Sequence, residues 1–128
     1  MSTPTPPPAW DAPAPVPPLS PQDERTWAIL VHLLPLLGVG LLAPLVVWLV
    51  FRGRGPFLEH HAKESLNLQL TVLIAVAVGT LLSVVLFGIP ALLLVLAGVA
   101  WVVLEILAAV AASRWEWYRY PVTLRLVP

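Results

Sequence analysis

Long uncharged stretches, separated by short charged segments, dominate the pattern of the chain. Residues 26–51 carry no ionised side chain when His32 is taken as neutral, and residues 65–104 carry no charge at all. About 20 apolar residues suffice for a helix to cross the ~30 Å hydrocarbon core of a bilayer. Both stretches are therefore predicted to be membrane-spanning.

The second stretch is too long for one crossing. A single helix over it would be about 60 Å long, roughly twice the hydrocarbon thickness. Gly88-Ile89-Pro90 is the strong helix breaker near its middle. The pattern predicts a tight helical hairpin with helices at about residues 56–87 and 90–113, in which residues 56–64 form an interfacial extension.

The first stretch contains its own helix breakers. Ser20 can cap a helix whose first residue is Pro21. Further along, the breakers allow either one kinked span over about residues 21–51 or a re-entrant pair of short helices. We prefer one span because 26 residues amply cross a bilayer once. The predicted fold is all-α and integral to the membrane, with three transmembrane helices, the first kinked or re-entrant. The breakers are Pro35, Gly38, Gly40 and Pro44.

The two ends of the chain differ from this membrane domain of residues 21–128. Residues 1–20 are rich in proline and should form a disordered tail. Residues 114–128 mix aromatic and basic side chains, a pattern typical of an aromatic belt that fixes helix depth at the membrane surface. The aromatic residues of this segment are Trp115, Trp117, Tyr118 and Tyr120.

The distribution of lysine and arginine predicts how the protein is oriented in the membrane. Basic residues occur in the first loop and after the last helix, and the hairpin turn has none. The positive-inside rule places both basic regions in the cytoplasm, as in a multi-pass protein of a bacterial inner membrane with a cytoplasmic C-terminus. With three spans the proline-rich tail lies outside, and with a re-entrant first segment it is cytoplasmic too.

Composition excludes several classes of protein. Of 128 residues, 59% are hydrophobic and 11% are charged, the formal net charge is zero, and there is no cysteine. Nucleic-acid binders concentrate positive charge, so nucleic acid is not an expected partner. We find no phosphate-binding loop, nucleophile elbow or Ser/His/Asp set. We therefore expect neither catalytic residues nor a cofactor, and the protein is not expected to be an enzyme.

Glu105 is the most informative single residue, because ionisable groups inside a membrane are costly. Reflecting the hairpin about its turn places Glu105 beside Thr71 and within a turn of Asn67 or Gln69. The carboxyl is either protonated and holds the helices together, or it handles protons or cations. His32 would lie far from Glu105 in a three-span protein and could pair with it if the first segment is re-entrant.

Small residues recur every four positions along the first helix of the hairpin. Such a stripe lets membrane helices approach closely, which favours hairpin packing and dimerisation over a polar permeation path. The packing candidates are Ala75, Gly79 and Ser83, with Gly98 on the second helix.

A weak metal-site candidate precedes this stripe. His60 and Glu64 share a helix face and His61 is adjacent, but a stable site needs three or four converging ligands. A charged helix end at the membrane surface explains these residues better.

Four sequence runs resemble a family of small bacterial membrane proteins to which the magnetosome proteins MamF and MmsF belong. The runs are residues 27–33 (WAILVHL), 44–48 (PLVVW), 61–69 (HAKESLNLQ) and 118–124 (YRYPVTL), and the resemblance covers residues 23–127. Ala43 stands where the family would have glycine. The family is often called similar to the twenty-kilodalton component of the chloroplast import translocon. The resemblance implies a membrane domain of three or four helices and carries over no catalytic residue.

The sequence thus predicts a non-enzymatic scaffold or accessory subunit in the membrane. Its expected partners are the lipid bilayer and a second copy or another membrane protein. The alternative is a translocon-like or ion- or proton-conducting oligomer that uses Glu105 and the polar groups near it. Control of magnetite belongs to specialised members of the family, and the chain has no acidic loop beyond Glu59 and Glu64 to support it.

Overall fold

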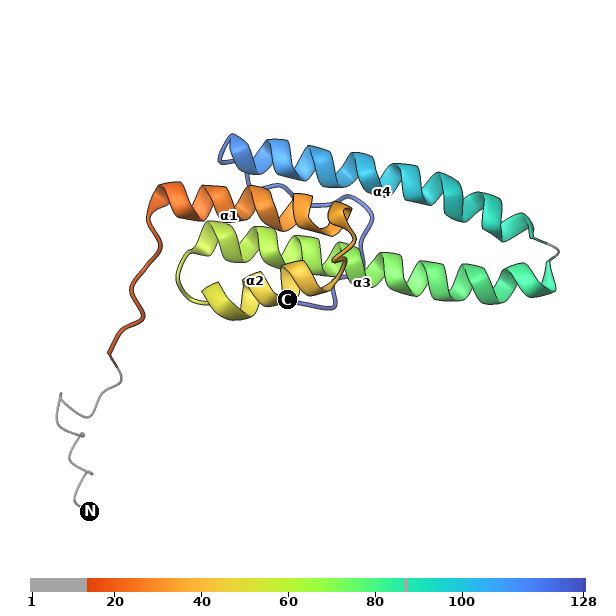
Figure 1. Cartoon of the computed structure of the whole chain (residues 1–128), viewed down its shortest axis with the longest axis horizontal. Helices are drawn as coiled ribbons and strands as arrows, with labels where there is room; N and C mark the ends of the chain where they lie inside the picture. The colour runs from red at the N-terminus through yellow and green to blue at the C-terminus, as the bar shows by residue number, and fades with distance from the viewer. Residues whose placement is uncertain (1–13, 87) are drawn as a thin grey trace, which may run out of the picture.

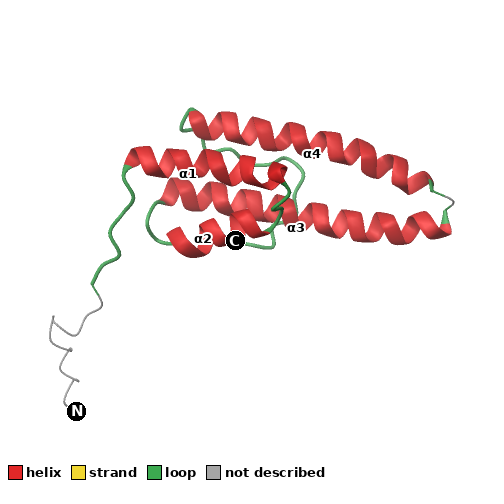
Figure 2. Ribbon diagram, viewed as in Figure 1, coloured by secondary structure: helices red, strands yellow, loops and turns green. Residues whose placement is uncertain are grey.

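The computed structural model describes residues 14–86 and 88–128, and within these ranges every regular element is a helix (Figure 2). The predicted all-α class is therefore confirmed. The elements are α1 (Pro21–Leu33), the short 3-10 helix η2 (Leu34–Leu37), α2 (Leu42–Phe51), α3 (Pro56–Val85) and α4 (Ile89–Ser113).

Helices α3 and α4 form the long hairpin that the sequence predicts (Figure 1). Helix α3 ends at Val85, and residue 87, the predicted helix end, lies outside the described residues. Gly88 adopts a left-handed φ of 85° and donates its N–H to the Ser83 carbonyl at 3.0 Å. Glycine adopts this conformation without steric cost, which explains why the chain reverses here.

The first segment reverses direction instead of crossing once (Figure 1). Ser20 caps α1 as predicted, accepting the Asp23 N–H at 3.1 Å. After η2, Gly38 and Gly40 take left-handed φ values of 91° and 47°, and the chain returns as α2. The chain therefore does not form the preferred single kinked helix; it forms two short helices that run in opposite directions, as the alternative requires. Among the described helices, α3 and α4 are the two that are long and apolar enough to cross a membrane, so three spans are not shown.

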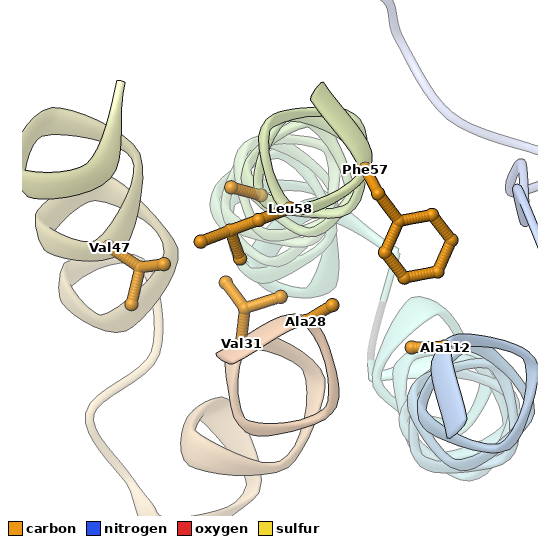
Figure 3. Packing of buried hydrophobic residues seen from close by; sticks show 7 residues of the cluster. Ala28, Val31, Val47, Phe57, Leu58 and Ala112 are labelled. Atoms are coloured by element: carbon orange, nitrogen blue, oxygen red, sulfur yellow. The ribbon is translucent and has the colours of Figure 1, made fainter. Parts of the chain in front are cut away.

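Helices α1 and α2 pack at the charged end of the hairpin, where α3 begins and α4 ends (Figure 1). Helix α1 contacts α3 and α4, while α2 lies against α3. Alanine, valine and leucine side chains and the ring of Phe57 fill the space between the four helices (Figure 3). Apolar burial of this kind contributes roughly 25 cal/mol per Å² of surface removed from water. The core residues are Ala28, Val31, Val47, Phe57, Leu58, Ala62 and Ala112.

The other half of the hairpin stands free of α1 and α2 (Figure 1). Apolar side chains along both of its helices are exposed, among them Leu73, Leu81, Val84, Leu92 and Val99. Extended exposed apolar surfaces are typical of proteins that contact lipid or another protein.

The small-residue stripe packs closely at one position. A Cβ added at Gly79 would lie 2.8 Å from the Leu94 side chain, whereas one added at Gly98 would meet nothing within 4 Å. Ala75 and Gly98 line a cavity of about 70 Å³ between the two helices. The Ser83 hydroxyl donates to the Gly79 carbonyl in its own helix, at 2.7 Å.

The difference in free space at Gly79 and Gly98 gives a test of hairpin packing. We expect Gly79→Leu to lower the thermal unfolding temperature of the purified protein, with a cost of about 1–3 kcal/mol from overpacking. Gly98→Ala should be neutral or slightly stabilising, because alanine favours a helix over glycine. Equal effects of the two substitutions would contradict the close approach at Gly79.

The N-terminal tail was predicted to be disordered over residues 1–20, and residues 1–13 of it lie outside the described residues. Residues 14–20 form no helix or strand. The Leu19 N–H donates to the Arg54 carbonyl at 2.8 Å, and Arg54 Nε donates to the Pro17 carbonyl at 3.0 Å. This part of the tail therefore lies at the α2–α3 turn.

Glu24 joins the start of α1 to the start of α3. Its Oε1 atom accepts the N–H groups of Phe57 and Leu58 at 2.8 and 3.1 Å. Free N–H groups at a helix start favour a negatively charged acceptor. The pattern of the sequence gives no sign of this contact, so the long-range cap by Glu24 was not predicted.

We expect Glu24→Ala to destabilise the protein by about 1–2 kcal/mol, since both α3 N–H groups lose their acceptor. Glu24→Gln keeps an oxygen acceptor and should cost less. Chemical denaturation in detergent measures both, with exposed Gln22→Ala in the same helix as the control. A Glu24→Ala protein as stable as the control would show that the cap contributes nothing.

Candidate functional site

A chain of buried polar side chains runs through the four-helix end of the molecule. It joins His32 on α1, His61 and Gln69 on α3, Glu105 on α4 and Tyr120 from the segment after α4. The two histidines and Glu105 are fully buried, and Tyr120 is 1% exposed. We call these five residues the buried polar network.

Each member of the network has a partner inside the protein. His32 Nε2 lies 3.0 Å from His61 Nδ1, and His61 Nε2 donates to the Glu116 carbonyl at 2.9 Å. The Tyr120 hydroxyl lies 2.8 Å from His32 Nδ1 and 2.9 Å from Glu105 Oε2. Gln69 Nε2 donates to Glu105 Oε1. Such a satisfied network stabilises and rigidifies the fold around it.

The structure brings together part of the predicted set. Gln69 donates a hydrogen bond to Glu105. The reflected hairpin placed either Asn67 or Gln69 within a turn of Glu105, and the structure selects Gln69. His32 Nδ1 lies 3.4 Å from Glu105 Oε2, which is the pairing expected only for a re-entrant first segment. His32 therefore does not lie far from Glu105, as a three-span protein would require, because the chain reverses after α1 and α1 packs against α4.

Asn67 and Thr71 have a different role from the predicted one. Asn67 donates to the Val127 carbonyl at 2.9 Å and accepts the Val127 N–H at 2.7 Å. Thr71 Oγ1 accepts the Leu124 N–H at 2.9 Å. Both side chains therefore hold the backbone of the C-terminal segment and do not bond Glu105.

The C-terminal segment, residues 114–128, folds back along the bundle (Figure 1). Trp115 and Trp117 are exposed, as an interfacial belt requires, but Tyr120 is buried against Leu68 and Ala108. The assignment of Tyr120 to an aromatic belt was wrong. Its hydroxyl finds partners in the core, so the residue gains burial without an unsatisfied polar group.

Sequence reasoning missed the bonds that Tyr120 and Arg125 make to Glu64. Glu64 Oε2 accepts the Tyr120 N–H at 3.0 Å, and Glu64 Oε1 accepts a bond from Arg125. A usable signal was present: Asn67 and Thr71 are polar, lie one helical turn apart in an apolar run, and need partners when buried.

The weak metal candidates do not converge. His61 points into the network, His60 Nε2 donates to the Tyr118 carbonyl at 2.7 Å, and Glu64 binds Arg125. Within residues 14–86 and 88–128, no three His, Asp or Glu side chains are arranged to hold a metal ion.

Burial sets the protonation of the network members that lie outside α3 and α4. Loss of hydration lowers the pKa of His32 to about 3, so its imidazole is neutral at physiological pH. Burial, with Glu105 nearby, raises the pKa of Tyr120 above its ordinary value. Tyr120 therefore acts as a neutral hydroxyl that can donate and accept at once.

Comparison with known proteins identifies the family of this chain. The model of the magnetosome magnetite crystal formation protein family, MamF/MmsF, matches residues 23–127. The chain belongs to the MamF/MmsF family. No curated protein and no solved structure matches it, so similarity to the chloroplast import component stays a prediction. The MamF/MmsF match includes the buried polar network and all but the last residue of the C-terminal segment, and it leaves out the proline-rich tail.

Proposed function

We propose that this MamF/MmsF-family chain is a non-enzymatic scaffold or accessory subunit of a bacterial inner membrane. The observation that carries the proposal is the contrast between a closed interior and an open apolar surface. The buried polar network is bonded within the protein, whereas the free half of the α3–α4 hairpin exposes apolar side chains on both helices. Such a surface suits lipid and a neighbouring membrane helix.

The proposed arrangement is multi-pass, with α3 and α4 crossing and the α1–α2 pair re-entrant. The α2–α3 turn and the C-terminal segment carry basic residues, while the hairpin turn carries none. By the positive-inside rule the charged end faces the cytoplasm. Residues 17–19 are bonded to Arg54 at that same end, so the tail is cytoplasmic as well.

A second candidate function is proton or cation conduction by an oligomer. The observation that favours it is the line of hydrogen-bonded groups from His61 through His32 and Tyr120 to Glu105. A mineral-binding role finds less support, because the exposed acidic residues of the described chain are dispersed and few. We do not extend the family's printed association with magnetite to this chain.

The experiment that separates these functions uses the full chain reconstituted in liposomes. Single cysteines at Leu81 or Val84, on the exposed part of α3, should form a discrete cross-linked complex, with cysteine at Ser20 as the control. We expect no proton or cation flux. A monomeric protein, or a flux that Glu105→Gln abolishes, would contradict the scaffold, and the flux would favour conduction.

A further inference from the structure

The donors and acceptors of the buried polar network fix where its hydrogens lie. At one end, the Glu116 carbonyl can only accept, so His61 Nε2 carries a hydrogen and donates it. At the other end, the Gln69 amide donates to Glu105 Oε1. The bonds between these two ends must be arranged with the hydrogens that remain.

The bond to Glu116 also determines which nitrogens of the two histidines carry a hydrogen. A neutral imidazole has one N–H and one bare nitrogen, so His61 Nδ1 is an acceptor. His32 Nε2, 3.0 Å away, therefore carries the hydrogen of that bond. His32 Nδ1 is then bare and accepts the hydroxyl hydrogen of Tyr120 at 2.8 Å.

The bond to His32 takes the one hydrogen of the Tyr120 hydroxyl, so this hydroxyl has no hydrogen left to donate to Glu105. Glu105 Oε2 lies 2.9 Å from the same oxygen, and two oxygens at that distance need a hydrogen between them. The remaining source is the Glu105 carboxyl itself, protonated on Oε2. The other arrangements, an imidazolium at His32 or at His61 together with a carboxylate at Glu105, place two charges at fully buried positions, which costs several kcal/mol per ion before their attraction offsets it.

We propose that Glu105, Tyr120 and His32 form a binding site for one proton, held on the Glu105 carboxyl and donated to Tyr120. The site is built from α4, the C-terminal segment and α1, and Gln69 of α3 orients the second carboxyl oxygen. The other ionisable side chains bonded to these residues are His61 and, through the Tyr120 backbone, Glu64 and Arg125, which form an ion pair with each other. This holds for the part of the chain that the structure describes.

The same bonds define how the proton moves. The Glu105 O–H bond breaks as its proton joins the Tyr120 oxygen, and the original Tyr120 hydrogen passes to His32 Nδ1. The products are a Glu105 carboxylate and a His32 imidazolium, so charge and atoms balance. Proton binding is independent of the scaffold function, because it requires neither flux nor an oligomer.

The test measures hydrogen positions directly in the full chain in liposomes. The chain has three histidines, so ¹⁵N labelling of histidine gives three imidazoles, and His60→Gln identifies the signal of His60. In mildly acidic buffer, where exposed carboxylates with a pKa of ~4 stay ionised, we expect neutral His32 with hydrogen on Nε2. Infrared spectra should show a carboxylic-acid C=O band that Glu105→Gln removes and that exposed Glu116→Gln leaves in place.

Two variants keep the proposal falsifiable. A glutamine amide at 105 can still donate to Tyr120, so Glu105→Gln should preserve the His32 tautomer. Tyr120→Phe should shift both the carboxyl band and the Nδ1 resonance of His32, because the bridging hydroxyl is lost. A His32 imidazolium in the wild-type protein, or a spectrum without a Glu105 acid band, would overturn the proposal whether or not the protein acts as a scaffold.

Discussion

Tyr120→Ala is expected to destabilise the protein by about 3–5 kcal/mol, the usual cost of removing a buried aromatic side chain. The ring fills the space beside Leu68 and Ala108, and its hydroxyl lies between His32 and Glu105. Without it, the C-terminal segment loses its anchor in the core. Thermal unfolding of the detergent-purified protein measures the loss.

A matched pair of substitutions isolates the hydroxyl. Tyr120→Phe should cost about 1–3 kcal/mol, because His32 and Glu105 lose a buried partner. Tyr118→Phe makes the same change two residues earlier, where the structure shows no hydrogen bond to the hydroxyl among the described residues, and should alter stability by less than about 0.5 kcal/mol. Equal unfolding temperatures for the two variants would contradict the bridging role.

Glu105→Ala is the second large effect, with an expected loss of about 3 kcal/mol or more. The substitution leaves the Gln69 amide and the Tyr120 hydroxyl without their buried partner and creates a cavity. Glu105→Gln keeps the shape and a donor and should cost about 1 kcal/mol or less. Thermal unfolding and limited proteolysis of the C-terminal segment are the measurements.

Two results for the substitutions at position 105 would contradict these expectations. If Glu105→Ala unfolds at the wild-type temperature, the network does not hold the helices together. If Glu105→Gln is as damaging as Glu105→Ala, the carboxyl is needed as an ion, and the neutral arrangement of hydrogens is wrong.

Local signals predicted the hairpin and its turn well. The charge-free run, the Gly88 breaker and the Ser20 cap each act within a few residues, so their consequences can be read from the chain itself. The path of residues 26–51 depended instead on a choice between two arrangements of similar plausibility. The glycines at 38 and 40 decided it, through left-handed conformations that permit a full reversal.

The site was predictable only in part, because its bonds join residues far apart in the sequence. Gln69 and Glu105 could be paired by folding the hairpin about its turn. Tyr120 could not, since its position depends on the whole C-terminal segment turning back onto α3. Glu24 was missed for the same reason: its partners are the first N–H groups of a helix more than 30 residues away.

The unequal lengths of the two helix pairs have a mechanical consequence. Helix α3 has 30 residues and is about 45 Å long, whereas α2 has 10 residues and is about 15 Å long. In the membrane arrangement proposed above, with α3 and α4 upright, the protein would be broader in the leaflet that holds α1 and α2 than in the opposite leaflet. A body of this shape would act as a wedge and would favour a bilayer that bends with the broad leaflet on the convex side.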